Sequence, residues 1–365
     1  MTMDSTSSNY QSCFTELLAQ PVYGMSQQEK SKKLLALMAH LHQHHLTHCS
    51  AYARLFSQAP PAFSCYDELP YLAVRLFKLQ RLASIADSEV FRELRSSGTT
   101  GQTPARVILD KATSARQSKA LVTIMQQFIG KQRLPMLIID SPDVLASPDL
   151  SARAAGIQGM AFFGRKPSYA LNTDMTLNTQ AVREFTERHK GEPVLLFGFT
   201  FMVWLHFVKA IERSGINVDL SQGILIHSGG WKKLVDQQVT NGVFKNSLTS
   251  LTGLTRIHNF YGMAEQVGSV FVECEKGHLH APSLADVVVR CPYTLRPLPH
   301  GETGLIQVLS ALPTSYPGFS ILTEDMGAII GEDDCGCGRK GRYFTLAGRL
   351  PKTEIRGCSD TAGVA

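Results

Sequence analysis

The order of apolar runs along the chain limits the fold more than any other feature. Four short apolar runs have the length of buried strands, at residues 105 to 110, 134 to 140, 193 to 199 and 223 to 230. Stretches of helical period follow them, at residues 114 to 129, 179 to 190, 200 to 214 and 231 to 248. Strands that alternate with helices predict an α/β domain with a largely parallel sheet. In such sheets ligands bind beyond the carboxyl ends of the strands.

The regions on either side of this core have different patterns. Residues 26 to 57 keep apolar residues at helical spacing after a serine and predict one or two helices. Past about residue 265, short strand-like runs between Gly and Pro turns predict a β-rich portion packed on the core. We therefore expect four parts: an N-terminal helical part (1–90), an α/β core (91–265), a β-rich portion (266–347) and a C-terminal tail (348–365).

Composition narrows the class of protein. The chain has 365 residues, of which 44% are hydrophobic and 18% charged, as in ordinary globular proteins. A net charge of +5, with Lys and Arg scattered, does not indicate a nucleic-acid surface. No apolar run has the length of a membrane span, and the polar start lacks the pattern of a signal peptide. We expect a cytoplasmic protein with neither a nucleic acid nor a membrane as its partner.

The segment SSGTTGQTP, at residues 96 to 104, is rich in hydroxyls and bare backbone amides. Such a loop suits phosphate oxygens, which accept hydrogen bonds from both kinds of group. The same residues also form ordinary surface turns. Neither GK[ST] nor an adjoining GxGxxG is present, so the common nucleotide fingerprints do not decide between the two interpretations.

Further motifs follow this loop in a characteristic order: SGG at 228 to 230, NFYGMAEQ at 259 to 266, ILTEDMG at 321 to 327 and GR at 348 to 349. The ordered set resembles the adenylate-forming enzymes, the superfamily of acyl-CoA ligases, luciferases and peptide-synthetase adenylation domains. The resemblance implies ATP and Mg²⁺ as ligands and makes the core of residues 91 to 265 the nucleotide-binding part.

The resemblance also implies a role for each matching residue. The loop residues would embrace the β- and γ-phosphates, with Thr99 a catalytic candidate. Tyr261 and Gly262 belong to the YGxxE signature, whose aromatic ring flanks the adenine and whose acid, Glu265, helps to hold Mg²⁺. The nucleotide set comprises Ser96, Ser97, Gly98, Thr99, Thr100, Gly101, Gly229, Gly230, Tyr261, Gly262, Glu265, Asp325 and Arg349. Within this set, the resemblance implies that Gly229 and Gly230 lie beside the adenine. It also implies that Asp325 binds the ribose hydroxyls and that Arg349 supports Asp325.

The chain departs from the superfamily pattern in two places. Ala105 and Arg106 stand after the proline of the loop, where a lysine is usual. Leu350 follows GR in place of the hinge acid, and the chain lacks the length of the usual small C-terminal domain with its catalytic lysine. We expect that domain to be reduced to a short tail.

The tail and an N-terminal segment narrow the resemblance to one branch. With RGCSD at 356 to 360 and ELPYLAVRLFK at 68 to 78, the chain resembles the acyl-protein synthetase of the bacterial fatty acid reductase complex, the LuxE-like family. The resemblance makes Cys358 the thiol that accepts the acyl group and passes it to a reductase subunit. Independently, nearby Lys352 and Arg356 favour a thiolate at Cys358. The alternative is an incidental terminal cysteine.

A second group of cysteines suggests a metal site. CEKGHLH at 274 to 280 and CGCG at 335 to 338 form two close clusters of soft or borderline ligands. The candidate ligands are Cys274, His278, His280, Cys335 and Cys337, and the preferred zinc set omits His278. Buried cysteines with surface histidines are the alternative. His40, His44 and His48 share a helix face at four-residue spacing, for which a polar face is favoured over a metal site.

The leading hypothesis is ATP-dependent activation of a fatty acid, followed by transfer to Cys358 and then to the reductase. Phe197, Phe199, Phe201 and Trp204 are candidates for an acyl pocket or for plain core. An acyl-CoA or aryl-CoA ligase of the phenylacetate type is the second hypothesis, and a non-catalytic binding module is the third. Pyrophosphate release on adding ATP and a fatty acid separates the first two from the third.

Overall fold

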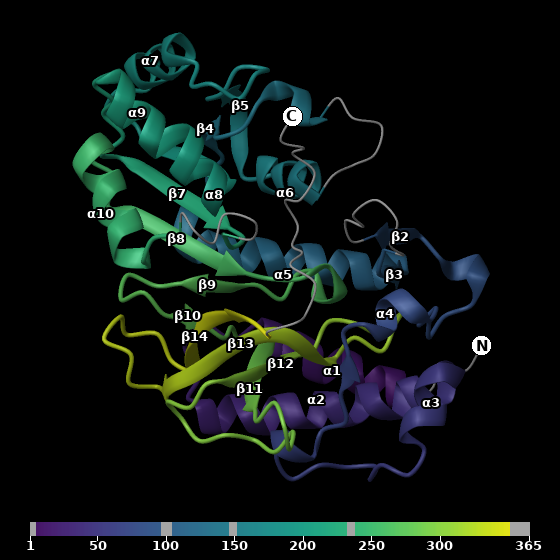
Figure 1. Cartoon of the computed structure of the whole chain (residues 1–365). Coiled ribbons are helices and arrows are strands. Elements are labelled where there is room, and N and C mark those ends of the chain that lie inside the picture. The colour runs from purple at the N-terminus through teal and green to yellow at the C-terminus, as the bar shows by residue number, and fades with distance from the viewer. Residues whose placement is uncertain (1–4, 96–103, 146–151, 232–237, 351–365) are drawn as a thin grey trace. The chain divides into compact units, whose positions relative to one another are not determined.

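The computed structural model describes residues 5 to 95, 104 to 145, 152 to 231 and 238 to 350 (Figure 1). These residues form two compact units. Described residues up to 127 and from 262 onward form the first, which we call the β-rich unit. Residues 128 to 261 form the second, which we call the parallel-sheet unit. The mixed α/β class is confirmed, and the division into four parts stays a prediction.

The parallel-sheet unit contains the predicted parallel sheet. Its strand order is β8–β7–β6–β4–β5, and each neighbouring pair is parallel. The strands are β4 (Leu134–Ile138), β5 (Gly164–Tyr169), β6 (Val194–Phe199), β7 (Gly223–Ser228) and β8 (Arg256–Tyr261). All six residues of β6 are buried, as expected for a central strand covered on both faces.

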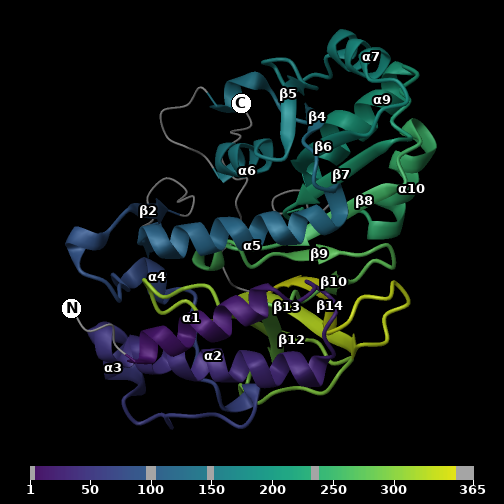
Figure 2. The ribbon, with the colours of Figure 1, turned by 180° about the vertical axis from the view of Figure 1, so that it is seen from behind.

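Helices flank this sheet on both sides. They are η3 (Pro142–Leu145), α6 (Ala152–Ala161), α7 (Thr179–Arg188), α8 (Thr200–Met202), η4 (Val203–Val208), α9 (Lys209–Ser214) and α10 (Asn241–Thr252). Helices α7, α9 and α10 gather on one side of the strands and α6 on the other (Figures 1 and 2). Helix α10 begins after Thr240, whose side chain accepts a hydrogen bond from the Val243 amide, and ends at Gly253 with φ +73°. It therefore starts later than the helix predicted from residue 231.

The β-rich unit is built on an antiparallel sheet of order β11–β12–β13–β14–β10–β9, with β1 parallel to β13. The strands are β1 (Leu72–Ala73), β9 (Phe271–Glu273), β10 (Leu279–His280), β11 (Ala285–Arg290), β12 (Gly304–Ser310), β13 (Ser320–Glu332) and β14 (Arg342–Arg349). The strand predicted at residues 105 to 110 is β3 (Arg106–Leu109), but it does not join the parallel sheet. It pairs antiparallel with β2 (Arg92–Arg95), because a hairpin partner lies close in sequence.

The N-terminal helices cover one face of the antiparallel sheet (Figures 1 and 2). The helices of this unit are α1 (Ser5–Leu18), α2 (Gln27–His48), α3 (Ser50–Phe56), η1 (Tyr66–Glu68), α4 (Leu76–Leu79), η2 (Asp87–Glu89), η6 (Ala264–Gln266) and α5 (Lys111–Ile129), whose last residues belong to the other unit. In α2, Lys30 forms a fully buried ion pair with Asp286 of β11 at 3.2 Å. The Gln27 side chain donates to the same carboxylate at 2.7 Å. A buried charge pair with further hydrogen bonds fixes the helix on the sheet.

The histidines of α2 are part of the packing. His45 is fully buried and its ring nitrogens meet the Ser84 hydroxyl at 2.8 Å and the Pro313 carbonyl at 3.2 Å. His44 contacts the Thr314 carbonyl at 2.8 Å and stacks on His48. Among the described residues one group of side chains is close enough to hold a metal ion, and no α2 histidine belongs to it.

Buried neutral histidines make stability depend on pH. Burial lowers the pKa of His42 to about 4 and that of His227 to about 3, whereas an unfolded histidine titrates near 6.5. As the pH falls below 6.5, these two histidines bind protons in the unfolded chain but not in the folded protein. We therefore expect the free energy of unfolding to fall, through His42 until about pH 4 and through His227 until about pH 3. Each ring contributes up to about 1.4 kcal/mol per pH unit. Urea unfolding of the wild type and His42→Asn at several pH values checks this; an unchanged slope in His42→Asn, with exposed His48→Gln as control, would contradict it.

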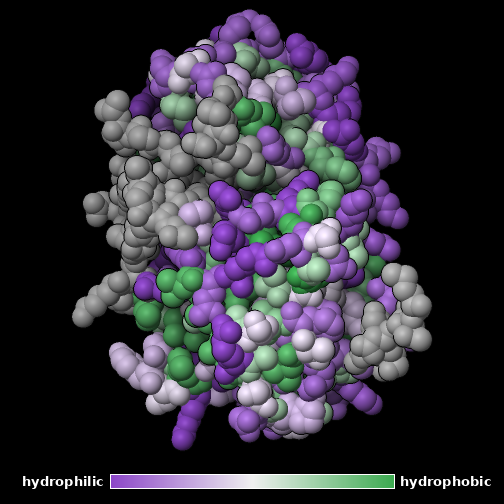
Figure 3. Space-filling view, turned by 90° about the vertical axis from the view of Figure 1, so that its right-hand side faces the viewer, coloured by the Kyte–Doolittle hydropathy of each residue, from purple (hydrophilic) through white to green (hydrophobic). Residues whose placement is uncertain are grey.

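The described part of the chain holds no helix that is both long and apolar enough to cross a membrane. On the face drawn in Figure 3, hydrophilic residues cover much of the visible surface, and hydrophobic residues form small groups between them.

Candidate active site

The carboxyl edge of the parallel sheet carries three of the predicted nucleotide residues. Ser228, the last residue of β7, pairs with Phe260 of β8, so Gly229 and Tyr261 leave the sheet side by side. Gly229 has φ +83°, and a Cβ there would lie 3.3 Å from the Phe199 ring. A Cβ on Gly230 would meet no atom of the described residues within 4 Å. The left-handed backbone at Gly229 therefore favours glycine directly after β7.

In the β-rich unit, Glu265 lies in the short helix η6 and is 7% exposed. Tyr316 donates to its backbone carbonyl at 2.9 Å, which holds η6 in place. Burial raises the pKa of the Glu265 carboxyl, and the positive charges of Lys78 and Arg349 oppose that rise. A carboxylate oxygen is a ligand that a hard divalent cation prefers, and the two nearby cations suit the negative charge of phosphate groups.

Asp325 and Arg349 form a pair across β13 and β14. The two residues are partners in the strand register, and Arg349 Nε donates to Asp325 Oδ1 at 3.0 Å. The aspartate side chain is 20% exposed and the arginine side chain 41%. A half-exposed ion pair of this kind contributes little to the free energy of unfolding. Its main effect is that Arg349 orients the Asp325 carboxylate.

The segment of residues 68 to 78 places two cations near these acids. Strand β1 pairs with β13, after which Arg75 Nε binds the Glu324 carboxylate, next to Asp325. Phe77 meets the Tyr316 ring edge-on, and the next residue, Lys78, is the cation that acts on Glu265. In the sequence, this segment indicated only the resemblance to the LuxE-like family and no role in the site. Its proximity depends on a parallel pairing between strands about 250 residues apart, which no local pattern predicts.

Several predicted residues lie outside the part of the chain that the structure describes: Ser96, Ser97, Gly98, Thr99, Thr100, Gly101 and Cys358. On either side of the loop segment, Arg95 and Arg106 are partners in the β2–β3 hairpin. Ala105 is fully buried, and Arg106 is half-buried in β3. Gly262 is described and follows β8; a Cβ there would come within 3.1 Å of Val270.

The aromatic residues considered for an acyl pocket are mostly core. Phe197 is fully buried, Phe199 and Trp204 are each 5% exposed, and Phe201 is half-buried. Phe199 also packs against α6, since a Cβ on Gly156 would lie 2.9 Å from its ring. Dense packing of this kind is typical of a protein interior.

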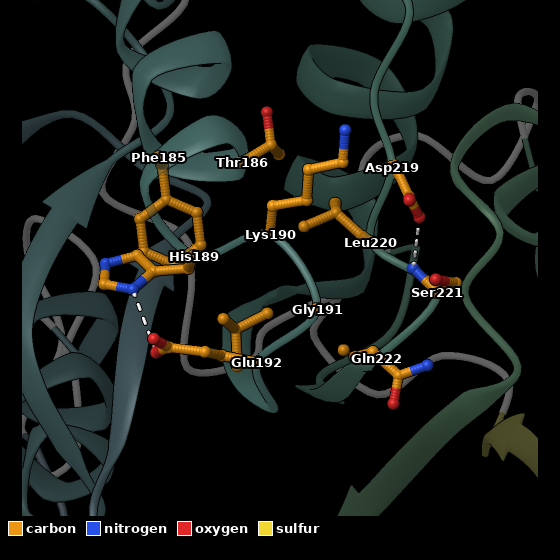
Figure 4. A pocket seen from close by; sticks show the side chains of 12 residues that line it. Phe185, Thr186, His189, Lys190, Gly191, Glu192, Asp219, Leu220, Ser221 and Gln222 are labelled. Carbon is orange, nitrogen blue, oxygen red and sulfur yellow. Dashed lines mark hydrogen bonds and ion pairs between the residues drawn. The ribbon is translucent and has the colours of Figure 1, made fainter.

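A pocket of about 260 Å³ lies at the other edge of the parallel sheet, where β6 and β7 begin (Figure 4). Its lining is polar, with His189 contacting Glu192 at 3.4 Å and the Asp219 carboxylate accepting from the Ser221 amide at 3.0 Å. Because ligands of open α/β sheets bind at the carboxyl ends of strands, this pocket is in the wrong place for the nucleotide. Its lining does not suit an acyl chain.

The predicted cysteine and histidine ligands come together in the β-rich unit. The ligand atoms of Cys274, His280, Cys335 and Cys337 all lie within 4.8 Å of one another. This is the set that the sequence favoured. His278 lies beside it, with Nδ1 at 3.6 Å from the Cys335 sulfur.

Comparisons with known proteins agree on the family. The family model described as "Acyl-protein synthetase, LuxE" matches residues 6–364. A long-chain-fatty-acid–luciferin-component ligase of Vibrio harveyi is 23% identical over 300 residues, which cover 80% of this chain and 77% of the relative. The ligase of the same name from Aliivibrio fischeri is 23% identical over 271 residues, covering 72% and 70%.

Solved structures share the fold. A 2-hydroxyisobutyryl-CoA ligase, in an open conformation with its acyl-adenylate and CoA, superposes with a TM-score of 0.67 at 17% identity, covering 91% of this chain and 78% of that one. The same enzyme in its thioesterification state gives 0.67 at 18% identity, with 90% and 70% covered. Since the family model spans nearly the whole chain, this protein belongs to the LuxE family of acyl-protein synthetases and is a ligase with the fold of the adenylate-forming enzymes.

Proposed function

We propose that this protein activates a fatty acid with ATP and transfers the acyl group to a thiol. The observation that carries the proposal is the family match over residues 6–364, a span that includes every predicted nucleotide residue. The names of the two bacterial relatives support a long-chain fatty acid as the substrate and a luciferin component as the acyl acceptor.

In the first step, a carboxylate oxygen of the fatty acid attacks the α-phosphorus of ATP. A new phosphorus–oxygen bond forms, the bond to pyrophosphate breaks, and the products are acyl-adenylate and pyrophosphate. Asp325, oriented by Arg349, binds the ribose hydroxyls, while Tyr261 and the Gly229–Gly230 backbone flank the adenine. The hydroxyls and amides of residues 96 to 101, Thr99 among them, bind the phosphates. Catalysis of this kind depends on position and electrostatics.

Mg²⁺ is the metal of the proposed reaction. Glu265 would hold it, because its buried carboxylate in η6 supplies the kind of oxygen ligand that Mg²⁺ prefers. When bound there, Mg²⁺ would supply positive charge that offsets the negative charge of the phosphates. A second metal, Zn²⁺, is proposed for the Cys274 cluster, and no step of this reaction uses it.

In the second step, the Cys358 thiolate attacks the acyl carbonyl carbon. A carbon–sulfur bond forms, the bond to the AMP oxygen breaks, and the acyl group is carried as a thioester. A thiol–thioester exchange then passes the acyl group to a reductase subunit and restores Cys358. The AMP leaves with the electron pair of the broken bond, so no other reactant is required.

Two measurements on one sample test the proposal. Purified protein receives Mg²⁺, ATP and an alkyne-tagged fatty acid, and we expect both pyrophosphate release and a hydroxylamine-sensitive label on the protein. Pyrophosphate release without label, followed by product formation once CoA is added, would favour the acyl-CoA or aryl-CoA ligase alternative. Absence of pyrophosphate with every acid tried would favour a binding module.

Lys78 is expected to contribute to the first step. Its charge lowers the pKa of Glu265, so Lys78→Ala removes a cation from the acid that binds the metal. We expect kcat/KM for pyrophosphate formation to fall about tenfold, equivalent to about 1.4 kcal/mol. The acidic limb of the pH–rate profile should also move to higher pH, because Glu265 then holds its proton more tightly.

The pH shift distinguishes an electrostatic role for Lys78 from a structural one. Lys78→Arg should restore most of the rate and the wild-type profile, and Lys32→Ala, a change at an exposed lysine of α2, should leave both unaltered. A Lys78→Ala enzyme with wild-type rate and profile would remove Lys78 from the site.

A further inference from the structure

The Cys/His cluster lies apart from the proposed reaction and has the geometry of a metal centre. We propose that Cys274, His280, Cys335 and Cys337 bind one structural Zn²⁺ ion. A tetrahedral zinc with Zn–S bonds of about 2.3 Å and Zn–N bonds of about 2.0 Å sets neighbouring sulfurs about 3.8 Å apart and sulfur and nitrogen about 3.5 Å apart. The Cys274 and Cys335 sulfurs are 3.9 Å apart, and the Cys337 sulfur is 3.3 Å from His280 Nε2.

Two tight turns present the ligands. In the first, Gly277 donates to the Cys274 carbonyl at 3.0 Å with φ +84°, and β9 and β10 then pair so that His280 follows six residues after Cys274. In the second, Gly338 donates to the Cys335 carbonyl at 2.9 Å with φ +83°. Each glycine adopts a left-handed conformation that other residues disfavour. The four ligands are therefore positioned by backbone geometry before any ion binds.

The surroundings of the sulfurs fit thiolates bound to a metal. The Lys276 amide donates to the Cys274 sulfur at 3.3 Å, a hydrogen bond that would stabilise a metal-bound thiolate. Three thiolates, a neutral imidazole and Zn²⁺ carry a net charge of −1. Arg339, two residues after Cys337, supplies a neighbouring positive charge that Glu275 holds through two hydrogen bonds at 2.6 and 3.3 Å.

His280 favours a metal over a plain core of reduced cysteines. The ring is fully buried, and its Nδ1 has no hydrogen-bond partner among the described residues. The other ring nitrogen, Nε2, faces the Cys337 sulfur at 3.3 Å, so coordination at Nε2 would supply a strong bond to a buried ring that otherwise has few polar contacts. The 3.9 Å between Cys274 and Cys335 is too long for a disulfide, whose sulfurs lie about 2.05 Å apart.

The site has four protein ligands and three buried members, and it leaves no position for a substrate. A closed set of this kind is typical of structural zinc. The zinc ion would connect the β9–β10 turn to the loop between β13 and β14. Those two strands run from this loop to Asp325 and Arg349, so the ion would fix the end of the strand pair opposite the proposed ribose site.

The test is metal analysis of the full chain, expressed without a polyhistidine tag and purified without chelator. We expect about one zinc per chain, bound by a folded site. Replacement by Co²⁺ should give the intense visible bands of a tetrahedral centre with thiolate ligands. Both measurements use the wild-type protein, so they do not depend on the folding of a variant.

Variants then assign the ligands. Cys337→Ser and His280→Ala should lose most of the zinc, whereas His278→Ala and Cys291→Ser should keep it, because neither His278 nor Cys291 belongs to the set. Zinc and cobalt contents near zero in wild type would overturn the proposal, as would a Cys274–Cys335 disulfide in the native protein. Zinc retained by His280→Ala and lost by His278→Ala would also overturn the assigned set.

Discussion

Cys358→Ser should abolish the hydroxylamine-sensitive acyl label and leave pyrophosphate release close to that of the wild type in a single turnover. The serine hydroxyl is not ionised near neutral pH, whereas a thiolate is an effective nucleophile toward an acyl-adenylate. We expect labelling to fall by at least about 100-fold, the effect of losing a covalent nucleophile. Quantitative fluorescence of the tagged acyl group on the intact protein measures it.

Cys65→Ser is the matched control, because Cys65 is an exposed free thiol that the proposal does not use. It should label as the wild type does. A Cys358→Ser protein that still forms a hydroxylamine-sensitive adduct would move the acyl carrier to another cysteine. Equal loss of label and of pyrophosphate would instead assign Cys358 to the activation step or to the fold, and a thermal melt distinguishes those two.

Glu265→Gln should reduce pyrophosphate formation by about 10²–10³-fold, the usual effect of removing one preorganised electrostatic contact to a transition state. The amide keeps the size of the side chain and leaves the Tyr316 bond to the backbone carbonyl intact. The loss should be larger at low Mg²⁺ concentration, because the neutral amide binds the ion more weakly.

The pH dependence provides a second measurement on the same variant. Burial raises the pKa of Glu265 above its ordinary value, so the wild-type rate should decline as the pH falls toward that raised pKa. Glu265→Gln has no proton to gain and should lack this limb. Glu302→Gln, at an exposed acid, serves as the control. A Glu265→Gln enzyme with wild-type rate and Mg²⁺ dependence would show that another group holds the metal.

The sequence predicted the elements whose residues carry a strong periodic signal. The apolar runs at residues 134 to 140, 193 to 199 and 223 to 230 are parallel strands in the structure, because burial on both faces selects apolar residues throughout. The cluster of Cys274, His280, Cys335 and Cys337 was predictable because the residue types, rather than a periodic pattern, indicate it, and its zinc stays a proposal. The close approach of Gly229 to Tyr261 follows from adjacent strands in register.

Other elements carry no such signal. Strand β5 reads GRKPSY and is mostly exposed or half-buried, so its sequence resembles a loop. No residue range was predicted for α1, which lies in the predicted N-terminal helical part, or for α6. Helix α6 has two interior glycines, Gly156 and Gly159, which lower its helix propensity. The roles of Arg75 and Lys78 depend on β1 pairing with β13, which is set by tertiary packing. Residues 96 to 101 and Cys358 stay predictions from sequence.

The buried Lys30–Asp286 pair limits how this chain can exchange parts with its relatives. The two residues are 256 positions apart, yet each neutralises the other inside the same hydrophobic layer. Losing one partner costs about 3–5 kcal/mol, a large share of the stability of a typical domain. A chimera that takes α2 from one family member and β11 from another would inherit that penalty wherever the two parents differ at these positions. Helix and strand must therefore be inherited together, although most of the coding sequence lies between them.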